Sequence, residues 1–366
     1  MRRIKIKLEE IADVEHCRAA ILRAAKGKHR RKRVQRVLAD LDHYAEKLSA
    51  LILDPQAELQ AGEFVPVVEG SRKKERELCK PRFFPEHCLH WAVMLALIPP
   101  LDKRLYVYSC SCVKGRGTHY AKNALNRQLK DKRNSKYCLQ IDVRKFYESI
   151  DKGILVSILA WTIKDKRVVA ICRKIITSYP KDGLPLGYYS SAPFANLYLG
   201  EADDFIKRQD GVKHMVRYMD DIVILGGNKR LLHRALNNVR AFLDATRGLA
   251  LKKNWQVYKL PYQKKKGGRV KERRRYIDFV GFKFYRYKTT IRDTIFLPAM
   301  RCVRDVAKAK YTAQRAHRYF SYRGYFKHTD SANITRRYIR KRINQKRLKE
   351  IIRNETRNQD TSYVAA

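Results

Sequence analysis

Three aspartates lie where the sequence predicts the ends of β-strands. Asp142 closes a β-type run, and Asp220-Asp221 separate the two short apolar runs of a predicted hairpin. If these strands are neighbours in a small antiparallel sheet, the carboxylates lie together and repel one another unless cations neutralise them. Mg²⁺ prefers oxygen ligands, and two such ions stabilise the entering and leaving oxygens of an in-line phosphoryl transfer. The aspartates therefore predict metal-assisted phosphoryl transfer; the alternative is that Asp220-Asp221 only form a turn.

The charge of the chain points to a polyanionic partner. Its 366 residues include 81 Lys and Arg against 36 Asp and Glu, a formal net charge of +45. A compact protein with this excess repels itself unless a polyanion neutralises it. Nucleic acid is the expected partner, because clustered Lys and Arg release the counterions of its phosphates. This balance argues against an ordinary small-metabolite enzyme; the alternative is a surface that only keeps the protein soluble.

Other classes of protein are excluded by local patterns. The N-terminal sequence lacks the uninterrupted apolar stretch of a signal peptide. The longest apolar run, at 88–101, contains His90 and ends in Pro99-Pro100, so it is too interrupted to span a bilayer. Eight cysteines in a chain of this length do not make a disulfide scaffold, and the spacing of Cys110-Ser-Cys112 does not suit zinc. We expect reduced, mostly buried thiols and a cytoplasmic protein.

The apolar pattern predicts a mixture of helices and strands. Helices are predicted in 1–62, 86–97 (ended by Pro99-Pro100), 120–129, 154–163, 193–207, 231–243 and from 298 onward. Strands are predicted at 63–82 around a Gly70-Ser71 turn, and at 137–143, 215–219, 222–225, 258 and 276–287. The basic insert 264–275 is predicted as a loop. The order strand, helix, hairpin, helix, strand in the middle of the chain is typical of a ferredoxin-like α+β sheet.

Basic residues gather in segments outside this sheet. The run 26–33 lies between two predicted helices, and arginines alternate with tyrosines from 301 to 353. Guanidinium groups and aromatic rings together suit unpaired bases as well as phosphates. We expect contact with nucleic acid; the alternative is a solvated helix face. The side chains assigned to this contact are Lys114, Arg116, Lys264, Lys265, Lys266, Arg273, Arg274, Arg275, Arg336, Arg337 and Arg340.

Tyr218-Met-Asp-Asp221, between two apolar strands, resembles the signature of reverse transcriptases. Further motifs of that family follow in order over about residues 75–290. They are Asp142-Val-Arg-Lys-Phe-Tyr147, Gly183-Leu-Pro-Leu-Gly187 with Phe194-Ala-Asn-Leu-Tyr-Leu199, Leu249-Ala-Leu-Lys252 and Tyr276-Ile-Asp-Phe-Val-Gly-Phe282. The resemblance implies an RNA-directed DNA polymerase, a nucleotidyltransferase that extends a 3′-hydroxyl with dNTPs and releases pyrophosphate.

The resemblance also implies a right-hand polymerase fold, α+β, with a ferredoxin-like antiparallel palm sheet, fingers and a helical basic thumb. Residues 1–62 would be a basic helical N-terminal region and 63–135 the fingers. The palm would be 136–290, with interleaved fingers helices at about 150–182 and the basic insert 264–275. Residues 291–366 would form the thumb and a C-terminal RNA-binding region.

Roles for individual residues follow from the same resemblance. Asp142, Asp220 and Asp221, with the backbone of Val143, would hold two Mg²⁺ ions, or Mn²⁺ in their place. Lys252 would be the general acid toward the pyrophosphate leaving group. The primer grip would be Phe279, Val280 and Gly281.

The incoming nucleotide would be contacted by Tyr147, Phe146, Leu186, Gly187, Lys80 and Arg82. Tyr147 would be a steric gate whose ring fills the space of a ribose 2′-OH; the alternative is a core aromatic. Lys80 and Arg82 would bind the triphosphate or, alternatively, template phosphate. Leu186 stands where most reverse transcriptases have Gln. The absent hydrogen bond, about 1 kcal/mol, implies looser base selection.

Within the family, the chain is most similar to the reverse transcriptases of bacterial and phage diversity-generating retroelements. Residues 108–119, Pro185-Leu-Gly187 and Ile277-Asp-Phe-Val-Gly281 carry this similarity. That subgroup has Ser-Gln where this chain has Ser191-Ala192, which leaves open a defence-associated (antiphage) enzyme that copies a partner noncoding RNA. A catalytically silent RNA-binding scaffold is the alternative of another class.

The partners implied are template RNA, cDNA and dNTPs, with no membrane. A small basic accessory protein and a second copy of the chain stay open as further partners. The location implied is the cytoplasm of a bacterial or phage-infected cell.

Overall fold

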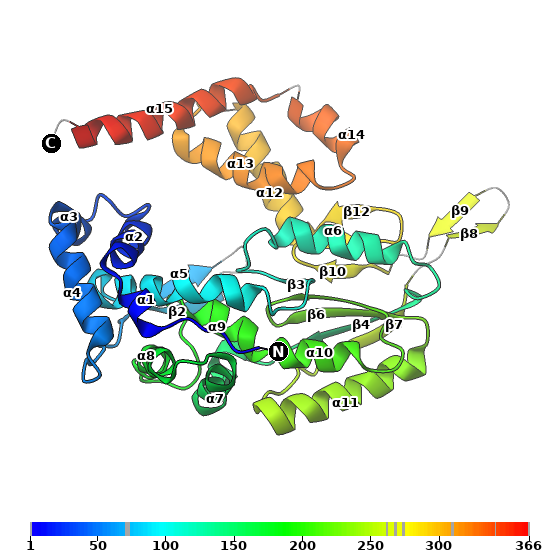
Figure 1. Cartoon of the computed structure of the whole chain (residues 1–366). Helices are drawn as coiled ribbons and strands as arrows, with labels where there is room; N and C mark the ends of the chain where they lie inside the picture. The colour runs from blue at the N-terminus through cyan, green and yellow to red at the C-terminus, as the bar shows by residue number, and fades with distance from the viewer. Residues whose placement is uncertain are drawn as a thin grey trace. The chain divides into compact units, whose positions relative to one another are not determined.

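The structure is a computed structural model that describes residues 2–69, 74–260, 263–266, 269–272, 275–308, 311–340 and 342–364. The chain folds into two compact units (Figure 1). Unit 1 contains residues 2–69, 74–121 and 133–258, and unit 2 contains the described residues of 122–132 and 259–364. The boundaries of fingers, palm and thumb stay predictions, because the two units are defined by compactness and not by function.

The centre of unit 1 is a five-stranded sheet. Its strands are β3 (Ser109–Cys110), β4 (Tyr137–Asp142), β5 (His214–Tyr218), β6 (Asp221–Gly226) and β7 (Gln256–Lys259). They lie in the order β3-β5-β6-β4-β7, with β6 antiparallel to β4 and β5, and β3 parallel to β5. Without the edge strand β3 this is a ferredoxin-like sheet, in which the first strand lies between the third and the fourth. The predicted α+β fold is confirmed.

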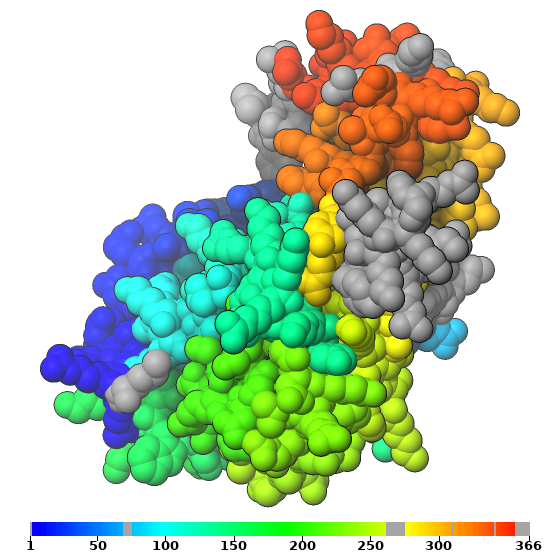
Figure 2. All heavy atoms as spheres, turned by 90° about the vertical axis from the view of Figure 1, so that its right-hand side faces the viewer, coloured from blue at the N-terminus to red at the C-terminus, as the bar shows by residue number. Residues whose placement is uncertain are grey.

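Helices pack around this sheet, which explains why its strands are so apolar. β6 is buried at five successive positions, 222–226, as expected of a central strand covered on both faces. The helices that follow β4 and β6 are α7 (Lys152–Thr162), α8 (Lys166–Thr177), α9 (Ser191–Tyr198), α10 (Gly200–Lys207) and α11 (Lys229–Arg247). Helices α10 and α11 lie together on one face of the sheet (Figure 1). In Figure 2 the segments coloured green to yellow-green, which include them, form a continuous surface.

Local sequence signals fix the ends of α11. The side chain of Asn228 accepts hydrogen bonds from the N–H groups of Arg230 and Leu231 at 2.9 and 3.3 Å, which caps the first turn. Gly248 ends the helix with φ +61°, a left-handed conformation that glycine adopts without strain. The helix predicted at 231–243 is confirmed and extends to Arg247, next to Gly248.

Two helices differ from their predicted extents. The predicted helix 193–207 is two helices, α9 and α10, which meet at Leu199. Helix α5 (Cys88–Asp102) continues through Pro99-Pro100, where the sequence predicted its end. Proline holds φ at a helical value, so two prolines in the last turns remove hydrogen bonds without turning the chain away.

The N-terminal region is helical, as predicted. Its helices are α1 (Leu8–Ala12), α2 (Val14–Ala25), α3 (Lys32–Ala39) and α4 (Leu41–Leu53). The Asp13 side chain caps α2 by accepting the N–H of His16 at 2.9 Å. Helix α2 packs against α4 and α5.

Two strands follow, β1 (Glu63–Glu69) and β2 (Lys74–Lys80), which pair antiparallel. Their pairing runs from Glu63 opposite Lys80 to Glu69 opposite Lys74. The antiparallel pair predicted at 63–82 is therefore confirmed. The predicted Gly70-Ser71 turn lies outside the described residues.

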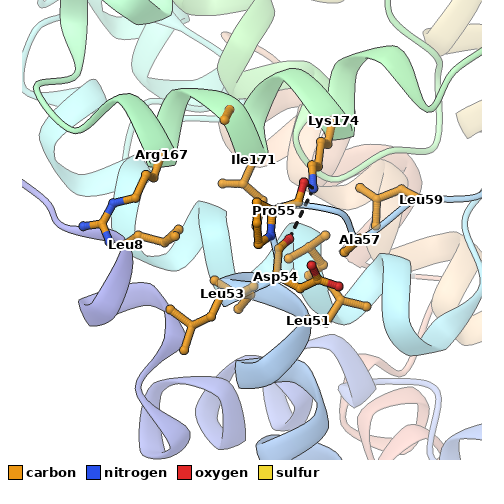
Figure 3. Close-up of a pocket in the computed structure, with 13 residues that line it drawn as sticks. Leu8, Leu51, Leu53, Asp54, Pro55, Ala57, Leu59, Arg167, Ile171 and Lys174 are labelled. Atoms are coloured by element: carbon orange, nitrogen blue, oxygen red, sulfur yellow. Dashed lines mark hydrogen bonds between the residues drawn. The ribbon is translucent and has the colours of Figure 1, made fainter.

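A small pocket of about 220 Å³ lies between α4, the segment after it, and α8 (Figure 3). Its walls are mostly apolar. The charged groups at its edge are already bound: Arg167 pairs with Glu9 and Asp165, and Lys174 Nζ donates to the carbonyls of Asp54 and Pro55. This pocket therefore belongs to the packing of the N-terminal helices and not to a reaction.

Unit 2 has a sheet of its own. Strands β10 (Ile277–Phe279), β11 (Phe282–Phe284) and β12 (Thr289–Ile291) pair antiparallel in that order. Val280 and Gly281, with φ +45° and +87°, make the tight turn between β10 and β11. The residues of α6 (Thr118–Leu129) from 122 onward belong to this unit, and Asn126 Oδ1 accepts a hydrogen bond from Thr289 Oγ1 at 2.9 Å.

The basic insert is not a loop where the structure describes it. Strands β8 (Gln263–Lys266) and β9 (Arg269–Glu272) pair antiparallel, so the predicted loop 264–275 is wrong for these residues. In the sequence, Gly267-Gly268 lies between two runs that contain Gln, Lys and Val, a pattern that is typical of a hairpin. The many positive charges of the insert favoured the prediction of a loop instead.

The C-terminal part of unit 2 is helical, as predicted. Its elements are α12 (Asp293–Lys308), α13 (Ala313–Lys327), α14 (Ala332–Ile334), η3 (Thr335–Arg340) and α15 (Gln345–Val364). They share a core that includes Tyr319 and Phe326, with 2% and 4% of their surface exposed. These two aromatic residues therefore stabilise the helices and cannot stack on bases.

The eight cysteines are all free thiols, as expected, and Cys112 is exposed while the other seven are buried. Among the helices described, none combines the length and apolarity needed to cross a membrane.

Candidate active site

The ends of β4 and of the β5–β6 hairpin bring two predicted carboxylates together. Asp142 ends β4, and Asp221 begins β6 directly opposite it. Asp220 lies in the turn between β5 and β6, where its carbonyl accepts the N–H of Val143 at 3.4 Å. Burial, and then the negative charge of Asp142, raise the pKa of Asp220 from 3.8 to about 6. Asp142 and Asp220 therefore act as a close pair.

The predicted cluster of three carboxylates is not formed. Among the residues that the structure describes, no group of three or more Asp, Glu, His or Cys side chains is close enough to hold a metal ion. Like charges repel, and Lys252 offsets only part of the charge of the Asp142–Asp220 pair. Asp221 flanks this pair instead of completing a cluster.

Lys252 contacts Asp142 through both backbone and side chain. Its N–H donates to the Asp142 carbonyl at 2.8 Å, and its Nζ donates to Asp142 Oδ2 at 2.6 Å. Its positive charge lowers the pKa of Asp220, against the larger effects of burial and Asp142. The predicted general-acid role thus requires the ammonium to leave this carboxylate first.

The carboxylate pair suits a hard cation. Within the described part of the chain, Asp142 Oδ1 is buried and has no hydrogen-bond partner, whereas Oδ2 binds Lys252. A buried oxygen without a donor is unfavourable, and carboxylate oxygens are the ligands that Mg²⁺ prefers. Val143, whose backbone was also predicted as a ligand, is fully buried beside the pair. These residues fit a divalent cation.

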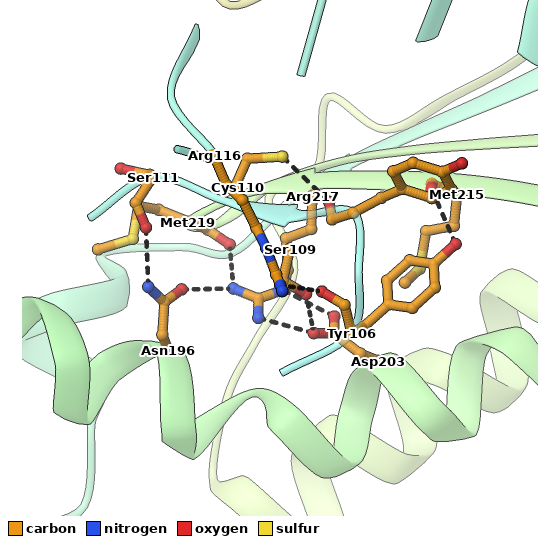
Figure 4. Close-up of polar contacts among 11 residues, drawn as sticks. Tyr106, Ser109, Cys110, Ser111, Arg116, Asn196, Asp203, Met215, Arg217 and Met219 are labelled. Atoms are coloured by element: carbon orange, nitrogen blue, oxygen red, sulfur yellow. Dashed lines mark hydrogen bonds and ion pairs between the residues drawn. The ribbon is translucent and has the colours of Figure 1, made fainter. Parts of the chain in front are cut away.

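A buried arginine to which the sequence gave no role, Arg217, donates to the carbonyl of Met219, the residue before Asp220 (Figure 4). Arg217 of β5 has no exposed surface, and its Nε and Nη2 each donate to Asp203 at 2.7 Å. Its Nη1 donates to Asn196 Oδ1 at 3.0 Å and to the carbonyl of Met219 at 3.1 Å. Met219 has φ +54°, which residues other than glycine rarely adopt. Arg217 therefore stabilises an unusual backbone conformation next to Asp220.

Two further polar side chains complete this network. Ser109 Oγ donates to Asp203, and Asn196 Nδ2 donates to the carbonyl of Ser111 at 3.0 Å. Both Ser109 and Asn196 lie in motifs that carry the family resemblance, yet no role was assigned to either. The available signal was the charge of Arg217 inside an apolar strand, because a buried arginine needs a partner.

The residues predicted to contact the nucleotide are not all accessible. Phe146 is 3% exposed and its side chain packs into the core; its contact with the nucleotide stays a prediction. The pattern showed an aromatic residue but not which side of η2 (Phe146–Ser149) it faces. Tyr147 is half-buried. Burial, and then the charges of Cys112 and Asp220, raise its pKa.

Two glycines fix the loop that precedes α9. At Gly183, with φ +74°, a Cβ would lie 2.2 Å from the carbonyl of Tyr147. At Gly187, with φ +112°, a Cβ would lie 2.4 Å from the carbonyl of Cys79 in β2. The carbonyl of Leu186 accepts the Cys79 N–H at 2.7 Å, so this loop is joined to β2.

Lys80 and Arg82 are exposed and line a basic pocket together with Gly187. Neither Asp142 nor Asp220 lines this pocket. The structure thus places Lys80 and Arg82 in a separate group of cations and not with the carboxylates.

The predicted primer grip lies in unit 2. Phe279 has no exposed surface, so its side chain packs inside unit 2, and its place in a primer grip stays a prediction. Gly281 is buried, and a Cβ there would lie 2.9 Å from Ile295 Cδ1 and 3.0 Å from Tyr325 Cε1. Val280 is half-buried at the turn and stays a prediction.

The basic residues predicted to contact nucleic acid differ in exposure. Arg116 is half-buried and donates from Nη1 to the Tyr106 carbonyl at 3.1 Å, so it supports its own loop. The exposed side chains are Lys114, Arg275, Arg336 and Arg337. Arg273 and Arg274, and the side chains of Lys264, Lys265, Lys266 and Arg340, lie outside the described residues.

Comparison with known proteins identifies the class of this fold and site. Residues 92–284, more than half of the chain, match the family described as "Reverse transcriptase (RNA-dependent DNA polymerase)". The chain therefore belongs to the reverse transcriptase family, whose members are RNA-directed DNA polymerases. No curated protein sequence matches the chain.

A solved structure of telomerase shares the fold. Telomerase from Candida tropicalis, in complex with the TWJ fragment of telomeric RNA, matches with a TM-score of 0.50 and 12% identity over 83% of this chain and 55% of that chain. Telomerase from Candida albicans, with a TWJ fragment of telomeric RNA, matches with a TM-score of 0.46 and 12% identity over 68% of this chain and 50% of that chain. The chain thus spans about half of these telomerase chains. At such identity the likeness shows the fold alone.

Removal of the Asp220 charge should stabilise the metal-free protein. The pKa of Asp220 is about 6 in the folded state and near 3.8 when unperturbed. Between these pH values the folded protein holds a proton that the unfolded chain has lost, so the free energy of unfolding falls as the pH rises. In urea unfolding with EDTA, Asp220→Asn should gain stability over wild type from pH 4 to 6, with a constant difference above pH 6. The exposed Asp204→Asn should show no such gain. A gain independent of pH would contradict this explanation.

The Arg217 network should affect activity beyond its effect on stability. Arg217→Met leaves Asp203 buried without its partner, which should lower the free energy of unfolding by roughly 3–5 kcal/mol. Arg217→Met with Asp203→Leu should recover most of that decrease. Both variants lack the donor to the Met219 carbonyl, so primer extension should fall roughly 100-fold in each. Arg234→Met with Asp210→Leu, an exposed pair, is the control. A wild-type rate in the Arg217/Asp203 double variant would show that the arginine serves stability alone.

Proposed function

We propose that this protein extends a DNA 3′-hydroxyl with dNTPs along an RNA template at the Asp142–Asp220 pair. One observation carries the proposal: the end of β4 and the β5–β6 turn bring two carboxyls together in a chain of the reverse transcriptase family. The buried, unpartnered Oδ1 of Asp142 supports a role in binding a cation.

Asp142 and Asp220 would hold the catalytic cations, with Asp221 and the backbone of Val143 beside them. When bound, two Mg²⁺ ions neutralise charge on the attacking and leaving oxygens of phosphoryl transfer. The chain itself orients Asp220 through Arg217 and the Met219 carbonyl. Lys252 offsets the charge of Asp142 through its 2.6 Å contact. On leaving that contact it is the donor of a proton to the leaving pyrophosphate.

Tyr147 would select deoxynucleotides. Its half-buried ring is close enough to Asp220 for the carboxylate to affect its pKa, which supports a place beside the sugar of the incoming nucleotide. Gly183 keeps the backbone of Tyr147 against the loop that holds Leu186. An aliphatic side chain at Leu186 offers shape without a hydrogen bond, so base selection would be loose.

The biological role that the motifs favour is mutagenic copying in a diversity-generating retroelement. Residues 108–119 and Pro185-Leu-Gly187 support it, whereas Ser191-Ala192 departs from that subgroup. The alternative, supported by that departure, is antiphage defence with a partner noncoding RNA. Neighbouring genes distinguish the two: a repeat-flanked variable gene with a small accessory gene for the first, and protection from phage for the second.

Primer extension tests the proposed catalytic pair. With an RNA template, a DNA primer, dNTPs and Mg²⁺, the wild type should add nucleotides, and Asp142→Ala and Asp220→Ala should reduce the rate by at least about 1,000-fold, the scale of removing a central electrostatic interaction. Asp221→Ala should also lower the rate. Asp204→Ala, an exposed carboxylate on α10, should leave the rate unchanged. If wild type adds no nucleotides, the alternative of a silent scaffold holds.

Sugar selection tests Tyr147. Tyr147→Ala opens space for a 2′-OH, so the ratio of rNTP to dNTP incorporation should rise on the order of tenfold or more. Tyr147→Phe keeps the ring and should keep the selection. Single-nucleotide incorporation with dATP and ATP measures both. Equal selection by Tyr147→Ala and wild type would show that Tyr147 only packs against the core.

A further inference from the structure

One face of helix α7 is apolar and is not covered by the rest of the described chain. Trp161, near the end of this helix, has 83% of its surface exposed. Ile158 and Ile154 lie three and seven residues before it, on the same side of the helix, and are half-buried. A helix that is apolar on most of its positions is normally covered all round. The outer face of α7 therefore lacks a partner.

A hollow of about 790 Å³ runs along this face. The residues of α7 that line it are Gly153, Ile154, Ser157, Ile158 and Trp161. A Cβ at Gly153 would have one neighbour outside the backbone of the helix, Asp151 Oδ1 at 3.2 Å. The hollow is therefore open beside Gly153, and its volume lies in the range of protein pockets that take up a ligand, roughly 300–1,000 Å³.

The hollow is anionic where α7 begins. Three of its five charged lining side chains are carboxylates, although Lys and Arg outnumber Asp and Glu by 81 to 36 in the whole chain. Asp151 is exposed, caps the helix through a backbone N–H at 2.7 Å, and forms no ion pair in the described part of the chain. Glu201 is exposed and pairs with the buried Arg247. The remaining donors of Arg247 bind the carbonyls of Tyr198 and Thr246, so its charge is used within the protein.

The other end of α7 lies beside cations. The N-terminal segment joins it there, because the N–H of Ile4 donates to the Thr162 carbonyl at 2.8 Å. A second hollow, of about 610 Å³, lies at this segment, and Arg104 lines both hollows. Five of the six charged side chains of the second hollow are cations. Those that are exposed, and that form no ion pair within the described residues, are Arg2, Arg3, Lys5 and Lys103.

The two ends of α7 therefore carry opposite charge on either side of an apolar stripe. Asp151 and Trp161 are ten residues apart, which is about 15 Å along a helix. Phosphates would be repelled by the anionic end and would find no donors on the stripe. A basic protein would satisfy the anionic end but would meet like charge at the other. A partner with both signs at the same spacing satisfies both ends, and a second copy has this pattern by symmetry.

We propose that this face of α7 binds the same face of a second copy of the chain, with the two helices antiparallel about a two-fold axis. An interface of this kind uses one surface twice. With the axis at Ser157, Trp161 of one copy lies over Gly153 of the other. Asp151 of each copy then lies beside the cations at the far end of the other helix. The dimer is independent of the polymerase proposal, because none of these side chains belongs to the Asp142–Asp220 pair.

Sedimentation of the full chain, freed of nucleic acid, tests the proposal. At about 0.15 M salt the Debye length is about 8 Å, so the repulsion between distant charges of the two copies is screened while groups in contact still interact. The wild type should dimerise as its concentration rises to about 0.1 mM, which populates even an interface of micromolar Kd. Trp161→Asp should raise the Kd at least about 30-fold, the scale of losing a central tryptophan. Leu22→Asp, which replaces an apolar side chain 47% exposed on α2, is the control.

A monomeric wild type at this concentration would overturn the proposal, and so would an equal loss of dimer in the two Asp variants. A fluorescent oligolysine peptide identifies the other occupant. If it binds a monomeric wild type and Trp161→Asp removes that binding, the face belongs to a basic protein and not to a second copy.

A cysteine on the axis tests the two-fold geometry, because it meets its own copy. Ser157→Cys is made together with Cys112→Ser, which removes the exposed native thiol. On mild oxidation with copper phenanthroline, the two introduced thiols should each lose a hydrogen to the oxidant and form a disulfide-linked dimer. Thr177→Cys in the same background, an exposed position on α8, should crosslink at least about tenfold more slowly, because its thiols meet only by collision. Equal rates at the two positions would overturn the antiparallel arrangement.

Charge exchange tests the pairing of the ends. Asp151→Lys places cations against cations and should raise the Kd of the dimer on the order of tenfold. Adding Lys5→Glu and Lys103→Glu to Asp151→Lys restores opposite charges across the interface and should recover most of that loss. Recovery shows pairing between copies, since lost capping of α7 by Asp151 would persist in the triple variant. A triple variant that dimerises no better than Asp151→Lys would contradict the proposed pairing.

Discussion

The geometry of the site depends on one buried ion pair. Arg217 and Asp203 lie in a region without solvent, where a charge is tolerated only if its hydrogen bonds are satisfied. The guanidinium meets this condition by binding the Asp203 carboxylate twice, the Asn196 amide and the Met219 carbonyl. The pair thus joins β5 to α9 and α10, and the last of its bonds fixes the turn in which Asp220 lies. Packing of the sheet and position of the carboxylate are consequences of the same four hydrogen bonds.

The second constraint is electrostatic. A chain with a net charge of +45 keeps a close pair of carboxyls at one end of its central strands, where burial, and then the charge of Asp142, raise the pKa of Asp220. Lys252 offsets this repulsion by binding one oxygen of Asp142 and leaves Oδ1 without a donor. The protein therefore offsets the charge of the pair only in part, which supports the proposed role of Asp142 and Asp220 in binding a cation.

Local patterns were sufficient to predict the sheet apart from its edge strand β3, and to place Asp142 and Asp220 close together. Apolar runs that end in acidic residues identify β4 and the β5–β6 hairpin, and the strand pairing places the two carboxyls. The partners of Arg217 were not predictable in this way, because Asp203 and Asn196 are 14 and 21 residues distant in sequence and come from helices. The burial of Phe146 and Phe279 was not predictable for another reason: a motif gives the residue type, while burial depends on which side of a short element faces the core. The continuation of α5 through Pro99-Pro100 was likewise not predictable from the local pattern, because it depends on how the helix packs.

The exposed thiol of Cys112 is a natural site for chemical labelling, so no cysteine has to be added or removed. All eight cysteines lie in the described part of the chain, and Cys112 alone is exposed. Its thiol is close enough to Tyr147 to influence the titration of that ring. A maleimide dye would therefore label the described part of the native chain at a single position near Tyr147, the residue proposed to select deoxynucleotides. Its emission would follow the arrival and departure of nucleotides in real time on individual molecules.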